Sequence, residues 1–170
     1  MPRDLCSASW FLFGLWLTLA LLGPMAAPGA SAADPELAGL EAALHQSVNR
    51  FRSEQHLIAL TREPALDAVA RAHSEDMAAR HFFSHESPEG QNWVDRLQRF
   101  GVDGFSMAGE NVGMTNRPNP NQEILHGWLT SPAHRRNLTA RPFNATGIGI
   151  ARAPDGTLLY TQLYLSFPRD

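Results

Sequence analysis

The sequence predicts a single α+β domain, and three observations support that prediction. Apolar residues recur at helical spacing through residues 34–80, they alternate with period two near the C-terminus, and no repeat or low-complexity tract divides the chain. Residues 33–170 are enough for one domain, which at this size buries roughly two thirds of its unfolded surface. A second domain does not fit.

The first part of the chain has the pattern of a secretory signal peptide. An apolar run over residues 10–22 follows a start region with one basic residue, Arg3, and precedes the small-residue site Ala30-Ser31-Ala32. The run is short for a bilayer span. We therefore predict a signal peptide at 1–32 and a secreted or periplasmic domain at 33–170, with no stable membrane span after cleavage. An uncleaved membrane anchor is the alternative, because Asp4 partly offsets Arg3.

Composition narrows the chemistry of the domain. The one cysteine, Cys6, lies within the leader, so disulfides, thiol catalysis and thiolate metal sites are excluded from the rest. The net charge is -3, and the basic residues are scattered apart from the pair Arg135-Arg136. This distribution argues against nucleic acid as a partner.

Two amphipathic helices are expected first. Asp34-Pro35-Glu36 supplies an N-cap, a proline at the first helical position and an acidic first turn. A second helix is expected from Pro64 to about Arg80, with His73 on its apolar face, where a histidine with one hydrogen-bond partner is favoured over a ligand. The apolar positions are Leu37, Leu40, Leu44, Val48 and Phe51 in the first helix and Leu66, Val69, Ala70 and Met77 in the second.

Shorter elements follow. A helical stretch from Trp93 to Phe100 is ended by Gly101 and Gly104, and residues 116–121 have turn chemistry and predict a surface loop. The next amphipathic helix carries Ile124, Leu125, Trp128 and Leu129 and ends at Ser131-Pro132. A hairpin then spans residues 146–152 and 158–167 around a turn at 154–156.

Three spaced phrases each place a single imidazole or carboxylate among aromatic, small or turn-forming residues: Phe82-Phe83-Ser84-His85, Gly109-Glu110-Asn111-Val112 and Trp128-Leu129-Thr130-Ser131-Pro132-Ala133-His134-Arg135. With Asn49 and Arg52, they resemble the CAP superfamily of cysteine-rich secretory, antigen 5 and pathogenesis-related proteins, in its disulfide-free bacterial SCP-like extracellular branch. The resemblance implies a CAP domain at 33–170, folded as a three-layer α-β-α sandwich with a central antiparallel sheet.

The same resemblance implies a ligand cleft around His85, Glu110 and His134. The sequence departs from the eukaryotic pattern of two histidines and two glutamates, because Ser131 and Leu159 stand at the positions of the second glutamate and the second histidine. We infer that His134 replaces the missing histidine in space. Asn137 is expected to cap the end of its helix or to tie the helix to the sheet.

The chemistry of this trio leaves alternatives open. Two imidazoles and a carboxylate are competent zinc ligands, so His85, Glu110 and His134 could hold a divalent cation with an open position. Their spacing lacks the density of a His-Glu-x-x-His helix, and a hydrogen-bonded cluster joining the first loop, the central strand and the last helix is the structural alternative. A nucleophilic Ser131 is less favoured, because serine before proline is an ordinary helix N-cap and no Gly-x-Ser-x-Gly elbow is present.

These observations predict a secreted or periplasmic CAP-domain protein that binds a small ligand, lipid-like, sterol-like or envelope-derived, or a divalent cation such as zinc. No catalytic residue is assigned. The alternative is a metal-dependent hydrolase of peptide or cell-wall material, with zinc on the histidines and Glu110 as ligand or general base.

Overall fold

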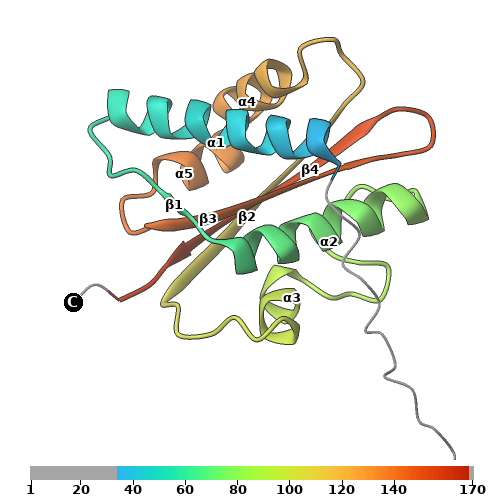
Figure 1. Ribbon diagram of the computed structural model, residues 1–170. Coiled ribbons are helices and arrows are strands. Elements are labelled where there is room, and N and C mark those ends of the chain that lie inside the picture. The colour runs from blue at the N-terminus through green and yellow to red at the C-terminus, as the bar shows by residue number, and fades with distance from the viewer. Residues whose placement is uncertain (1–33, 169–170) are drawn as a thin grey trace, which may run out of the picture. The chain divides into compact units, whose positions relative to one another are not determined.

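A four-stranded sheet with helices on both faces forms the described part of the chain, residues 34–168 of a computed structural model (Figure 1). The predicted signal peptide lies outside the described residues. None of the helices within residues 34–168 is long and apolar enough to cross a membrane. In chain order the elements are α1 (Pro35–Glu54), β1 (Thr61–Arg62), α2 (Pro64–Arg80), α3 (Trp93–Arg99), β2 (Met107–Thr115), α4 (Pro120–Thr130), α5 (Pro132–Thr139), β3 (Ala145–Arg152) and β4 (Leu158–Ser166).

The two long helices begin where the sequence predicts. The Asp34 carboxylate accepts the Glu36 backbone N–H at 2.9 Å, which caps α1, and Pro64 opens α2. The predicted apolar face of α2 is buried, including His73, whose ring hydrogen-bonds the Ser84 carbonyl oxygen at 2.9 Å. The histidine is thus a core residue with one partner, as predicted.

The sheet order is β1-β3-β4-β2. The pairs β3–β4 and β4–β2 are antiparallel, and β1 pairs in parallel with β3. The predicted antiparallel sheet is therefore mixed, because a two-residue strand after α1 joins it. Glu110 lies on β2, which is an edge strand and not the central strand that the sequence suggested.

Three layers result, as Figure 1 shows: α1, α4 and α5 lie on one face of the sheet and α2 and α3 on the other. Leu44, Trp128 and Leu138 pack on the first face of the sheet, and Leu66 and Leu97 pack on the second. Because both faces are covered, every residue of β4 is buried, so its apolar alternation does not mark a solvent face. The three-layer prediction is confirmed.

Two glycines let α2 approach the sheet. A Cβ atom at Gly147 would clash with the Leu66 backbone, and one at Gly149 would clash with the backbone of Ala70 and Arg71. The backbone of α2 therefore packs directly on β3. This contact fixes the position of the segment that follows α2, which carries His85.

The segment before the hairpin differs in detail from its prediction. The expected loop at 116–121 is shorter, because α4 already begins at Pro120. Helix α4 ends at Thr130, and a separate helix, α5, begins at Pro132 with Ser131 between them. His134 therefore lies on α5, in a different helix from Trp128.

Candidate functional site

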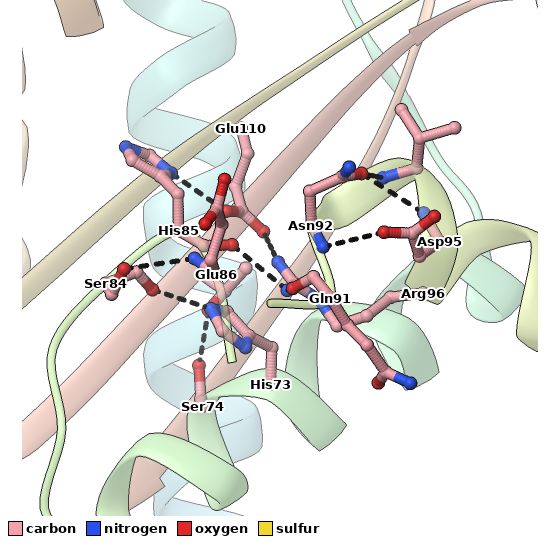
Figure 2. A network of polar contacts seen from close by, with 12 residues as sticks. His73, Ser74, Ser84, His85, Glu86, Gln91, Asn92, Asp95, Arg96 and Glu110 are labelled. Carbon is pink, nitrogen blue, oxygen red and sulfur yellow. Dashed lines mark hydrogen bonds and ion pairs between the residues drawn. The ribbon is translucent and has the colours of Figure 1, made fainter. Parts of the chain in front are cut away.

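Glu110 is the buried centre of the site. Its side chain has no exposed surface, and each of its two carboxylate oxygens has a cationic or imidazole partner. His85 Nδ1 lies 2.9 Å from Oε1, and Arg96 Nη2 donates to Oε2 at 2.6 Å (Figure 2). A carboxylate bonded at both oxygens by groups from two other segments holds those segments in one geometry.

Arg96 is the residue that the sequence analysis missed. It lies on α3 and is buried, and besides Glu110 it donates to the backbone oxygens of His85 and Gln91, both at 3.1 Å. One guanidinium thus connects two points of the loop between α2 and α3, at His85 and Gln91, to the carboxylate on β2. No periodicity or motif singles out Arg96, because an arginine in a short amphipathic helix ordinarily faces solvent.

His85 is oriented toward the surface by this pairing. With Nδ1 facing the carboxylate, Nε2 remains available to a ligand, and 41% of the side chain is exposed. The ring also packs edge-on against Trp93, with centroids 5.8 Å apart and an interplanar angle of 70°. A carboxylate that fixes ring and tautomer makes such an imidazole a preorganised hydrogen-bonding group.

His134 lies close by, with its ring centroid 6.4 Å from that of His85. Desolvation by burial lowers the pKa of His134, and the neighbouring His85 lowers it further, so the ring is neutral at pH 7. Asn111 and Asn137 hold α5 in place: Asn111 Nδ2 donates to the His134 carbonyl oxygen at 3.2 Å, and Asn137 Nδ2 donates to the Glu110 carbonyl oxygen at 3.0 Å. Asn137 therefore ties its helix to the sheet, as predicted.

A groove of about 480 Å³ runs beside His134. Ser131 and Trp128 line it from the helices and Met114 from β2, while the Trp128 indole donates to the Val112 carbonyl oxygen at 2.9 Å. A second hollow of about 210 Å³ shares Met114 with this groove. Thr157 also lines both hollows. The second is lined mainly by apolar side chains and also by His81 and Asp155; the apolar ones include Met77, Ala78, Phe82, Phe83 and Leu159.

The three predicted residues come together, but not as three ligands around one point. Within residues 34–168, no group of three or more His, Cys, Asp or Glu side chains is arranged to hold a metal ion. Both oxygens of Glu110 are already engaged, one of them by the guanidinium of Arg96. The donor set that fits a cation is the pair of imidazoles alone, so zinc binding stays a prediction.

The geometry also bears on the nucleophilic alternative. Glu110 orients His85, whereas the histidine nearer to Ser131 in the chain, His134, is held through its backbone oxygen by Asn111. A serine, a base and an orienting acid must be bonded in series for such a mechanism. Here the Glu110 carboxylate is bonded to His85 and not to His134.

Comparison with known proteins identifies the class. The profile of the CAP family, the cysteine-rich secretory protein family, matches residues 45–164, and the chain belongs to this family. The crystal structure of an extracellular protein containing an SCP domain from Bacillus anthracis has 33% sequence identity and a TM-score of 0.67, over 78% of this chain and 44% of that one. An outer surface protein of Borrelia burgdorferi shares the fold, with a TM-score of 0.69 at 16% identity, over 76% of this chain and 94% of that one.

The curated relatives are longer proteins. YkwD of Bacillus subtilis is 27% identical over 135 residues, which cover 79% of this chain and 50% of YkwD. The membrane protein YlbC of the same organism is 33% identical over 117 residues, which cover 69% of this chain and 32% of YlbC. The chain thus spans about half of the first relative and about a third of the second.

Proposed function

We propose that this CAP-domain protein acts outside the cytoplasm and binds a small amphiphilic molecule across two neighbouring hollows, the groove beside His134 and the hollow around Phe83. The observation that carries the proposal is a pair of shared lining residues: the groove next to His134 and the hollow around Phe83 both include Met114 and Thr157. One elongated ligand can therefore contact polar groups at one end and apolar groups at the other. Ligand sites commonly combine an apolar lining with a few placed polar groups.

The imidazoles define the polar end of the ligand. His134 is neutral at pH 7, and Nδ1 of the neighbouring His85 faces Glu110, which leaves Nε2 as the outward polar atom of that ring. An uncharged hydroxyl group both donates and accepts, so it can hydrogen-bond these rings. The carboxylate behind His85 is already balanced by Arg96, so the pair does not demand a charged head group.

Exposed apolar side chains define the other end. Met114 is 52% exposed and Phe83 is 47% exposed, and both line the smaller hollow. Large apolar side chains gathered at a hollow mark a binding surface more than scattered ones do. A long-chain alcohol or a sterol-like molecule fits this combination.

The test uses 1-dodecanol as the probe and follows binding by tryptophan fluorescence and calorimetry. Met114→Ser should weaken binding about fivefold, because it removes an apolar contact worth about 1 kcal/mol. Met107→Ser, at the other end of the same strand and 45% exposed, is the matched control and should bind as the wild type does. Equal binding by both variants, or no binding by the wild type, would refute the proposal.

The location outside the cytoplasm rests on the leader pattern and on the extracellular relative from Bacillus anthracis. If the leader is removed at Ala30-Ser31-Ala32, the exported protein begins at or near Ala33. Intact-mass measurement of protein recovered from the periplasm or the medium decides this. A mass that still includes residues 10–22 would contradict it.

The imidazole pair favours a divalent cation as a second candidate. His85 and His134 would supply two of the ligands of a zinc ion, and both must be unprotonated to bind it. Zinc affinity should then fall as the pH drops below about 6.5, and His85→Ala or His134→Ala should abolish binding. A wild type that takes up no zinc at neutral pH would remove this candidate and the metal-dependent hydrolase with it.

A further inference from the structure

The second face of the sheet carries a separate cavity, between α2 and α3. It has a volume of about 500 Å³ and is lined by His73 and Asp76 from α2, Gln91 from the loop, and Arg96, Arg99 and Phe100 at α3. The groove beside His134 lies among β2, α4 and α5, so the two sites share none of their lining residues. Arg96 links this cavity to the Glu110 cluster, because its Nη2 atom faces the carboxylate.

Two buried nitrogen atoms at this cavity lack partners. Within residues 34–168, the buried side-chain atoms without a hydrogen bond are His73 Nδ1 and Arg96 Nε, and both residues line this cavity. His73 is 1% exposed and Arg96 is 8% exposed. Buried polar atoms are nearly always satisfied, so two orphans at one cavity indicate a missing partner there.

The chemistry of the two atoms is complementary. His73 Nε2 donates to the Ser84 carbonyl oxygen, which leaves Nδ1 of the neutral ring as an acceptor, and burial lowers the His73 pKa so that the ring stays neutral. Arg96 Nε carries a hydrogen and can only donate. A hydroxyl group is the simplest partner for both, since it donates one hydrogen bond and accepts another.

Water molecules bonded to these two atoms would fill only a small part of the cavity. A water molecule occupies about 30 Å³ of liquid volume, whereas ligand pockets have volumes of about 300–1,000 Å³, and this cavity has about 500 Å³. At its rim Phe100 presents an aromatic ring that is 47% exposed, beside the exposed amide of Gln91 and the exposed guanidinium of Arg99. The acidic groups Asp76 and Glu89 both pair with Arg80, so the Arg99 charge remains available to a ligand.

We propose that the cavity between α2 and α3 binds a sugar unit with an acidic substituent, a uronic-acid type of saccharide. His73 Nδ1 and Arg96 Nε are buried, so the side chains that cover them must move for a ring hydroxyl to bond them. The apolar face of the sugar ring stacks on Phe100, and the carboxylate pairs with Arg99. Phe100 and Arg99 are both exposed, so they can be substituted without disturbing the core.

The experiment measures binding of glucuronate, glucose and acetate to the purified protein by saturation-transfer NMR and titration. Glucuronate should bind best, glucose more weakly and acetate not at all. Phe100→Ala and Arg99→Gln should each weaken glucuronate binding at least about fivefold. Phe83→Ala is the matched control, because Phe83 is equally exposed at 47% but lines the other site, and it should leave glucuronate binding unchanged.

A second readout reports on the buried pair. Saturating glucuronate should shift the ¹⁵N resonance of His73 Nδ1, which an ion attracted only to Arg99 would not move. Acetate binding as well as glucuronate would show a simple anion site and overturn the proposal. No glucuronate binding at millimolar concentration, or equal binding by wild type, Phe100→Ala and Arg99→Gln, would overturn it as well.

Discussion

Replacing Arg52 with lysine should destabilise the domain by about 3 kcal/mol although the charge is kept. Arg52 is fully buried on α1, and burial lowers its pKa. It has no carboxylate partner among its described hydrogen bonds; its guanidinium donates instead to four backbone oxygens, those of Ile58 and Leu138 at 2.9 Å and those of Ala140 and Phe143 at 3.2 Å. These bonds connect α1 to the end of α5, the helix that carries the second site histidine.

The magnitude follows from the geometry of the two side chains. A planar guanidinium bonds carbonyls on several sides at once, whereas an ammonium group is a single point at the end of a flexible chain. Lysine at position 52 therefore leaves two or three of the four oxygens without a donor, and each orphaned buried group costs about 1–3 kcal/mol. Since some carbonyl oxygens will be partly resatisfied, about 3 kcal/mol is expected, or a fall of about 10 °C in melting temperature.

Urea unfolding followed by circular dichroism measures this loss. Arg50→Lys is the matched control, since Arg50 lies two residues away on the same helix and is exposed. It should change the unfolding free energy by less than about 0.5 kcal/mol. If Arg52→Lys unfolds within that same margin of the wild type, the carbonyl cluster does not depend on the guanidinium fork and the reasoning fails.

Three further predictions concern glycine packing, a buried ion pair and the pH dependence of stability. Gly149→Ala should lower the unfolding free energy by about 3 kcal/mol or more, because its Cβ would meet the backbone of α2. Gly39→Ala, in open space on α1, should instead raise the unfolding free energy by about 0.5–1 kcal/mol. Thermal melts compare the two variants. Glu41→Gln should cost about 3–5 kcal/mol in urea unfolding, because this buried carboxylate pairs with two arginines. Burial lowers the pKa values of His73 and His134, so in mild acid the unfolded chain binds protons that the folded chain does not. The unfolding free energy should therefore fall as the pH drops below about 6.5. An unfolding free energy that stays constant from pH 7.5 to 5.5 would contradict this.

The long helices and the hairpin were predictable because their signals are local. Pro64 and the apolar spacing that follows it determine the start and the inner face of α2 without any knowledge of the sheet. The strand β1 was missed, since a pair of residues has no period and is a strand only because Thr61 and Arg62 meet Ala145 and Thr146 in space. The edge position of β2 has the same origin, because strand order depends on contacts distant in the sequence.

The residues of the site also divide into those with a local sequence signal and those without one. His85, Glu110 and His134 could be found because each is the single imidazole or carboxylate within a phrase that resembles a CAP-family phrase. Arg96 could not, because its role depends on a carboxylate that another strand brings to within 2.6 Å. The unpartnered nitrogen of His73 was likewise hidden: the sequence indicates that a core histidine needs one partner, but not that its second nitrogen stays unbonded in a residue that lines a cavity.

Arg96 also bears on which of the two proposed ligands suits the site. A divalent cation held by His85 and His134 would sit near a guanidinium that already satisfies one oxygen of Glu110, so the carboxylate would have to divide its charge between two cations. An uncharged hydroxyl group meets no such competition and leaves the His85–Glu110–Arg96 chain intact. The ion pair behind the imidazoles therefore favours a neutral head group over a metal ion. The second hollow, which shares Met114 and Thr157 with the groove, favours the same ligand, because a bare cation would make no use of its apolar side chains.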